Sequence, residues 1–236
     1  MPGTIYEVGD KSGVYCIEGA GRARVYYVAA PEFTLIDAGM PGQTDHILSA
    51  LAQIGVQPLQ VKRILVTHHH LDDVGSLYGL RKHTGAQVIA HPSDADYISG
   101  RRPRRAPSPG HVVSALVGLW GARRLQHVDP DRAAKDGDRI GSFTVIHTPG
   151  HTPGHLCFLR GDYLFSGDLL IASSGRFRET PHVFTADVQT SRASIRRVAT
   201  LDFQAILSAH NPPYVFGAAA KVRELANRMG MFAEED

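Results

Sequence analysis

Cysteine is scarce in this chain, with two residues among 236. Cys16 and Cys157 each lie within an apolar, strand-like stretch, where a cysteine usually serves as a small buried hydrophobic side chain. The sequence therefore favours neither a disulfide nor a cysteine metal site.

Long apolar runs and a strong net charge are also missing. No stretch approaches the roughly 18 apolar residues that a membrane-spanning helix requires. Residues 1–9 lack the basic stretch, followed by an apolar one, that marks a secretory leader. We therefore predict a cytoplasmic protein with no membrane partner. The formal net charge of +2 is too small to imply a polyanionic partner, so we expect no nucleic acid partner.

A segment at residues 98–132 begins basic and proline-rich and continues as an apolar, helix-like stretch from Val112 to Trp120. We interpret it as an insertion that forms a lid or pocket wall, with an ordinary connecting helix or a homodimer contact as the alternatives. Its arginines would suit a carboxylated substrate or nucleic acid, but such a run is more often solvated surface. They are Arg101, Arg102, Arg104 and Arg105.

Length and composition suit a single domain over residues 1–236, because 43% hydrophobic and 20% charged residues allow a sizeable core. Apolar residues recur at helical spacing over 44–54, and further helices are predicted over 74–81, 189–200 and 217–228. Strands are predicted at 14–17, 25–29, 33–36, 63–67, 143–147, 155–160 and 163–166, with one more ending at 208. This alternation predicts an α/β fold in four layers, αββα.

Four metal-capable side chains follow the strand-like run at 63–67, namely His68, His70, Asp72 and Asp73. Imidazole nitrogen and carboxylate oxygen are ligands of Zn²⁺, Fe²⁺ and Mn²⁺. Two histidines one residue apart converge on one ion where a strand ends in a loop. A solvated loop with one of the acids as a helix cap is the weaker alternative, because the residues that complete a metal site occur downstream.

Three more candidates each follow an apolar run. His151 comes after the strand-like stretch at 143–147, Asp168 after Tyr163-Leu-Phe, and His210 after Ala205-Ile-Leu. Strands that each deliver one ligand at their end build a convergent site from distant segments.

In the order of these motifs, from Phe33 to His210, the chain resembles the metallo-β-lactamase superfamily of dinuclear hydrolases. The segment TPGHTPGH at 148–155 and the compact length are most similar to the glyoxalase II and lactonase-like branch. The resemblance implies the αββα sandwich of that family and a site that binds two divalent metal ions.

The resemblance also implies a role for each candidate ligand. The first metal would be held by His68, His70 and His151, the second by Asp72 and His210, and Asp168 would bridge them. The family motif ends in Asp-His, whereas this chain has Asp73 at the last position. A carboxylate there makes the second site harder and more negative. Either that site still fills, with Mn²⁺ or Fe²⁺ as alternatives to Zn²⁺, or the protein works with one ion.

This ligand set predicts hydrolysis. Two divalent ions share a water, lower its pKa to about 7 and present hydroxide to a carbonyl. Asp72 would orient that water and is the predicted catalytic residue. Because the charges of ions, acids and hydroxide nearly balance, we expect an ester, thioester or lactone in a small-molecule substrate. The sequence assigns no residue to substrate binding.

Two other functions stay open. Within the same superfamily, persulfide dioxygenases use one iron with two histidines and a carboxylate, which His68, His151 and Asp168 would supply. The second alternative is a binding protein that has kept the fold but lost catalytic turnover, and Asp73 in place of the family's histidine would mark that loss.

Several other polar residues receive lesser roles. His69 alternates in direction with its neighbours and should point away from the metals. His147 and His155 are expected to support the ligands or to pack. His182 would touch substrate or lie in a surface loop, and Asp37 is expected to be a turn acid that supports the ligand loop.

Overall fold

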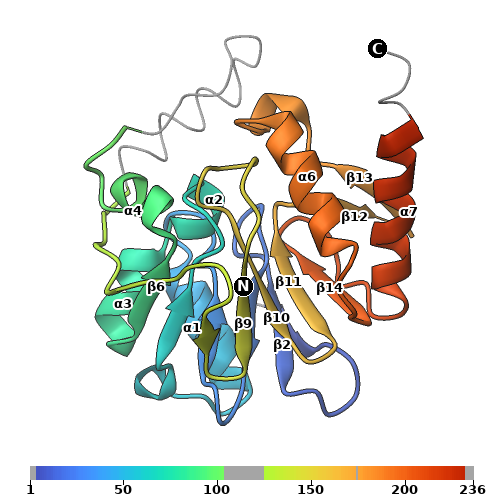
Figure 1. Ribbon diagram of the computed structural model, residues 1–236. Coiled ribbons are helices and arrows are strands. Elements are labelled where there is room, and N and C mark those ends of the chain that lie inside the picture. Colours follow the sequence, from blue (N-terminus) through green and yellow to red (C-terminus); the bar gives the residue numbers. More distant parts are fainter. Residues whose placement is uncertain (1–3, 104–124, 174, 232–236) are drawn as a thin grey trace. The chain divides into compact units, whose positions relative to one another are not determined.

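The computed structural model describes residues 4–103, 125–173 and 175–231 (Figure 1). The chain divides into two compact units, an N-terminal unit of residues 1–134 and a C-terminal unit of residues 135–236. The single domain stays a prediction. So does the insertion at 98–132, of which residues 104–124, including Trp120, lie outside the described residues.

The N-terminal unit contains a seven-stranded sheet whose strands follow one another in chain order. The first four strands pair antiparallel, and from the fourth onward the pairing is parallel. Parallel strands end at the same edge of a sheet, so the residues after β4 and β5 become neighbours. The strands are β1 (Thr4–Glu7), β2 (Val14–Glu18), β3 (Val25–Val28), β4 (Thr34–Ile36), β5 (Arg63–Leu65), β6 (Gln87–Ala90) and β7 (Arg132–Ala133).

The core of this unit lies between the sheet and its helices. Ile47 and Leu51 of α1 and Leu80 of α3 are buried together with Tyr27 and Ile64 of the sheet. Alternate residues of each strand point to opposite faces, which explains why Tyr27 enters this cluster. The helices are α1 (Thr44–Gln53), α2 (Leu71–Val74), α3 (Leu77–Thr84) and α4 (Pro92–Ile98), with a 3₁₀ turn η1 (Pro58–Gln60).

The predicted helix over 74–81 was wrong at its first turn, because the chain forms α2 and α3 separately. A Cβ on Gly75 would stand 2.2 Å from the backbone nitrogen of Pro41. Ser76 donates its hydroxyl to the carbonyl of Met40 (2.6 Å) and accepts the backbone N–H of Gln43 (2.8 Å). The break between the helices therefore depends on the close approach of a segment more than 30 residues away.

The C-terminal unit contains a five-stranded sheet in the order β14-β11-β10-β9-β8 and a separate hairpin of β12 and β13. β14 joins the sheet parallel to β11, and the other neighbours are antiparallel. The strands are β8 (Arg139–Ile140), β9 (Phe143–His147), β10 (Leu156–Arg160), β11 (Tyr163–Gly167), β12 (Leu170–Ser173), β13 (Arg176–Glu179) and β14 (Ala205–Ser208).

Two long helices pack on this unit, α6 (Val188–Val198) and α7 (Ala218–Met231), and they lie side by side in Figure 1. Ile195 of α6 and Val222 of α7 share a buried cluster with Leu164 and Ile206 of the sheet. A 3₁₀ turn, η2 (His182–Phe184), precedes α6. Within the described residues, no helix is long and apolar enough to cross a membrane.

The prediction for the cysteines is confirmed, because Cys16 and Cys157 are both buried and free. Burial raises the pKa of the Cys16 thiol to about 11 and that of Cys157 to about 12. Both thiols are therefore protonated near neutral pH.

Candidate metal centre

The ligand segment of the N-terminal unit continues from β5. Val66 continues the strand pairing, because its backbone N–H donates to the carbonyl of Ile89 of β6 (2.9 Å). The helix α2 begins directly afterwards, where the N–H groups of Asp73 and Val74 donate to the carbonyl of His70 (3.1 and 3.0 Å). The rings of His68 and His70 meet edge to face with centroids 4.7 Å apart. The structure therefore brings these two predicted ligands together at the end of a strand.

A hydrogen-bond chain fixes the ring of His68. Asp37 accepts the backbone N–H of Thr67 at 2.8 Å and its hydroxyl at 2.9 Å. The same hydroxyl oxygen lies 3.0 Å from Nδ1 of His68. Because an ionised carboxylate only accepts, the single hydroxyl proton goes to Asp37, and the oxygen accepts the N–H of Nδ1. This tautomer leaves Nε2 of His68 with the lone pair that a metal requires.

Asp73 is fully buried beside this ring, with its Oδ2 3.3 Å from Nε2 of His68. An N–H···O hydrogen bond usually spans about 2.7–3.2 Å. Two ligands that each lie about 2.0–2.1 Å from one tetrahedral ion stand about 3.3 Å apart. The pair therefore fits two ligand atoms of one cation. Asp72, the neighbouring acid, is half-buried in the first turn of α2.

His69 belongs to a different cluster. Its backbone N–H donates to Oδ2 of Asp94 (3.0 Å), its Nδ1 lies 2.9 Å from the same oxygen, and its ring stacks on Tyr97 at 4.1 Å. Asp94 and Tyr97 both come from α4. The ring is thus engaged by α4, as expected for a histidine that alternates with the two ligands.

The loop after β9 places His151. Gly150 has φ +130°, and a Cβ there would stand 2.2 Å from the backbone nitrogen of Ser191 on α6. The N–H groups of Asp187 and Ala186 bond the carbonyls of Gly150 (2.9 Å) and His151 (3.1 Å). The start of α6 therefore clamps this loop, and His151 is buried within it.

Asp168 follows β11, where a register shift interrupts the pairing with β14. Its Oδ2 lies 3.5 Å from Nε2 of His151 and 3.1 Å from Nε2 of His210. His210 follows β14 in the same way, and its side chain is 35% exposed. The C-terminal unit thus gathers two imidazoles around one carboxylate oxygen.

His155 supports Asp168 rather than joining it. Its Nε2 accepts the backbone N–H of Asp168 (3.2 Å), so the ring proton is on Nδ1, which lies 2.8 Å from the hydroxyl of Thr148. The ring is fully buried. Thr180 donates its hydroxyl to the carbonyl of Asp168 (2.6 Å). Both polar groups of the Asp168 backbone are therefore held.

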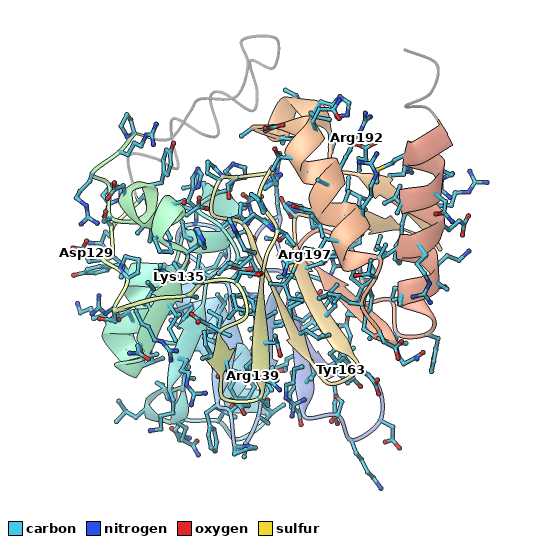
Figure 2. All side chains as sticks on the ribbon, in the orientation of Figure 1. Asp129, Lys135, Arg139, Tyr163, Arg192 and Arg197 are labelled. Atoms are coloured by element: carbon cyan, nitrogen blue, oxygen red, sulfur yellow. The ribbon has the colours of Figure 1, made fainter. Side chains whose placement is uncertain are left out.

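Two other histidines lie apart from these groups. His147 bonds the carbonyl of Pro153 through Nε2 (3.0 Å). His182 is 60% exposed, with Nε2 3.7 Å from Glu179. Arg192 of α6, which Figure 2 labels, also forms an ion pair with this carboxylate. The structure therefore places His182 on the surface of its unit.

The structure gives each unit its own donor group. The N-terminal group contains His68, His70 and Asp73, with Asp72 adjacent in the chain, and the C-terminal group contains His151, Asp168 and His210. Imidazole nitrogens and carboxylate oxygens at these spacings suit a divalent cation of the zinc, iron or manganese type. The sequence analysis missed Thr67, Asp94 and Thr180, whose contacts depend on folding rather than on any local pattern.

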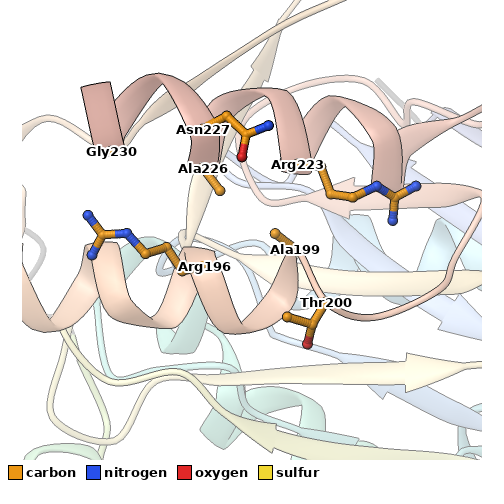
Figure 3. A pocket seen from close by; sticks show the side chains of 7 residues that line it. All are labelled: Arg196, Ala199, Thr200, Arg223, Ala226, Asn227 and Gly230. Atoms are coloured by element: carbon orange, nitrogen blue, oxygen red, sulfur yellow. The ribbon is translucent and has the colours of Figure 1, made fainter. Parts of the chain in front are cut away.

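A groove on the C-terminal unit, about 580 Å³ in volume, contains none of these donors. It lies between α6 and α7, with Ala199 and Ala226 on its two facing sides (Figure 3). Arg196 and Arg223 extend toward opposite ends of the groove in this view, so they do not gather around one ligand. The other residues that line it are Thr200, Asn227 and Gly230.

Comparisons with known proteins agree with this donor chemistry. The family model of the metallo-beta-lactamase superfamily matches residues 23–210. The "Probable metallo-hydrolase YflN" of Bacillus subtilis (strain 168) is 29% identical over 231 residues, which cover 88% of each chain. A "Hydroxyacylglutathione hydrolase" of Albidiferax ferrireducens is 35% identical over 160 residues, which cover 65% of this chain and 51% of that protein. This chain thus spans about half the length of the second relative.

Among solved structures, BJP-1, a subclass B3 metallo-beta-lactamase of Bradyrhizobium japonicum, superposes with a TM-score of 0.70 at 21% identity. The match covers 99% of this chain and 95% of BJP-1. This likeness shows the fold and confirms the α/β class predicted from the sequence.

Proposed function

The chain belongs to the metallo-β-lactamase superfamily, and from this premise we propose that it is a metal-dependent hydrolase of ester, thioester or lactone bonds in small molecules. The spacing of the donor atoms carries the proposal. Nε2 of His151 lies 3.5 Å from Oδ2 of Asp168, as two ligands of one ion would, and Nε2 of His210 lies 3.1 Å from the same oxygen. The relatives named as hydrolases support the same reaction class.

The proposed ligand set follows the family pattern. The first metal would be held by the three histidines His68, His70 and His151, and the second by Asp72, Asp73 and His210. Asp168 would contribute to both. Zn²⁺ is the proposed ion at the first site. At the second site, the additional carboxylate favours a harder ion such as Mn²⁺ or Fe²⁺.

The reaction needs no amino acid nucleophile. Bound divalent ions supply a water of lowered pKa and a Lewis acid for the carbonyl oxygen. Thr67 holds His68 in its ligand tautomer, and His155 holds the backbone of Asp168. Asp72 is proposed to accept a hydrogen bond from the attacking water. The raised pKa of Cys157, about 12, keeps this thiol from acting as a nucleophile near neutral pH.

The position of Asp73 favours a second candidate function. Its carboxylate lies beside His68, which is a proposed ligand of the first metal. In this alternative, Asp73 would neutralise charge there instead of completing a separate second site. A protein with one ion would suit oxygen chemistry on iron, with His68, His151 and Asp168 as ligands.

Elemental analysis of protein purified without chelator separates the two candidates. Close to two ions per chain, with hydrolysis of a panel of thioesters, esters and lactones, supports the hydrolase. One iron per chain, with thiol-dependent oxygen consumption and no hydrolysis, overturns it. Asp168→Ala should remove metal and activity together, whereas Asp162→Ala, which changes an exposed acid of the same unit, should leave both intact. Full metal content in Asp168→Ala contradicts the assigned bridge.

The role of Asp73 has its own variant. Asp73→His restores the family's usual final residue, so zinc content should rise toward two ions per chain if position 73 contributes a ligand. Unchanged zinc content would remove Asp73 from the ligand set.

A further inference from the structure

A stack of flat side chains extends from the ligand segment of the N-terminal unit to its surface. The ring centres of His70 and His69 lie 5.1 Å apart. His69 stacks on Tyr97 with ring centres 4.1 Å apart and planes 10° apart. The guanidinium carbon of Arg102 lies 5.0 Å from the centre of the Tyr97 ring. Asp94 holds His69 through its backbone N–H (3.0 Å). The backbone N–H of Arg102 bonds the carbonyl of Asp96 (2.9 Å). The stack is therefore fixed to α4 at His69 and at Arg102.

The charge of Arg102 is not balanced by a carboxylate among the residues that the structure describes. Its neighbour Arg101 forms ion pairs with both nearby acids, Asp96 at 2.8 Å and Asp129. Arg102 is exposed, and its contacts within residues 4–103 and 125–173 are the backbone bond to Asp96 and the ring of Tyr97. One of two adjacent arginines is thus neutralised, and the other remains cationic.

The contact with Tyr97 leaves the N–H donors of the Arg102 guanidinium available for hydrogen bonds. The guanidinium carbon lies over the ring of Tyr97, and the N–H donors lie around the edge of the planar group. This fork matches the two oxygens of a carboxylate, and stacking reduces the conformational freedom that binding would otherwise remove. One such cation suits a single anionic group and falls short of what a polyanion requires.

We propose that Tyr97 and Arg102 form an anchor for a carboxylate on the substrate, so that the protein selects anionic esters or thioesters over neutral ones. The inference rests on the proposed function, which supplies the identity of the bond that is cleaved. The anchor itself contributes only to binding. Arg102 determines specificity, and Tyr97 positions it.

Binding of a matched pair of amides tests the anchor without requiring turnover. N-(4-nitrophenyl)succinamate and N-(4-nitrophenyl)butanamide share a ring and chain length and differ by one carboxylate. Isothermal titration of the metal-loaded protein should show about tenfold tighter binding of the succinamate. Arg102→Gln should abolish that preference, while Arg132→Gln, which removes the same charge from an exposed site of the unit, should retain it. Tyr97→Phe should preserve the preference and Tyr97→Leu should weaken it about threefold.

Equal binding of the two amides by the wild-type protein overturns the anchor, and so does an equal effect of Arg102→Gln and Arg132→Gln. The corresponding 4-nitrophenyl esters report on the proposed function separately. Hydrolysis of both esters at equal kcat/KM together with equal amide binding supports the hydrolase and overturns the anchor. Preferential succinamate binding with no hydrolysis of either ester supports the anchor and overturns the hydrolase.

Discussion

At the residue scale, one hydroxyl group connects the proposed site to the end of the sheet. Thr67 donates to Asp37 and accepts from His68, so a buried carboxylate sets both the position and the tautomer of a proposed ligand. Thr67→Val keeps the shape of the side chain but removes this link. We expect metal affinity to fall about 10–100-fold and the free energy of unfolding to fall by about 1–3 kcal/mol. Competition with a chromogenic chelator and urea unfolding measure the two effects.

The control for this substitution is another buried threonine of the same unit. Thr84 donates to the carbonyl of Leu80 (2.7 Å) and accepts the backbone N–H of Ala86 (3.1 Å), away from any proposed ligand. Thr84→Val should lower stability by a similar amount and leave metal affinity unchanged. Thr67→Ser should restore the affinity, because it retains the hydroxyl. An equal loss of affinity in both valine variants would show that Thr67 acts through stability alone.

At the element scale, the start of α6 and the loop after β9 depend on each other. Gly150 combines a φ of +130° with the approach of Ser191, and Ser194 of α6 donates its hydroxyl to the carbonyl of Pro149 (2.7 Å). Gly150→Ala should therefore force the helix and the loop apart. We expect a loss of about 2 kcal/mol or more in unfolding free energy, with weaker metal binding because His151 follows directly. Thermal unfolding and chelator competition measure these effects.

Gly161 supplies the comparison, because its φ is +52° and a Cβ there would meet nothing within 4 Å. Gly161→Ala carries a backbone penalty of about 1 kcal/mol without the steric clash. It should leave metal affinity intact. If Gly150→Ala were no worse than Gly161→Ala in either measurement, the contact with α6 would not be what holds the His151 loop.

At the scale of the whole molecule, the sequence predicted what local pattern determines. The strands near 63–67 and 143–147 were found because apolar, β-branched runs identify them, and each candidate ligand was found because it follows such a run. The contacts that hold the residues beside those ligands join Asp37 to Thr67 and Asp94 to His69, residues 30 and 25 positions apart. No local pattern reports such a pairing. The break at Gly75 was missed for the same reason, since it depends on Pro41.

The proposed ligands are divided between the residues before and after Ala134, so the proposed metal binding would require the entire chain. Ions bound only by the folded protein stabilise it by about 2.7 kcal/mol at one hundred times the dissociation constant. For a chain of this size, such a gain raises Tm by roughly 5–10 °C. We therefore expect chelation to lower Tm by that amount, and Tm to rise with the logarithm of free Zn²⁺. Asp168→Ala should show little dependence on Zn²⁺. Two separate unfolding transitions, of which only one responds to metal, would contradict a ligand set drawn from both units.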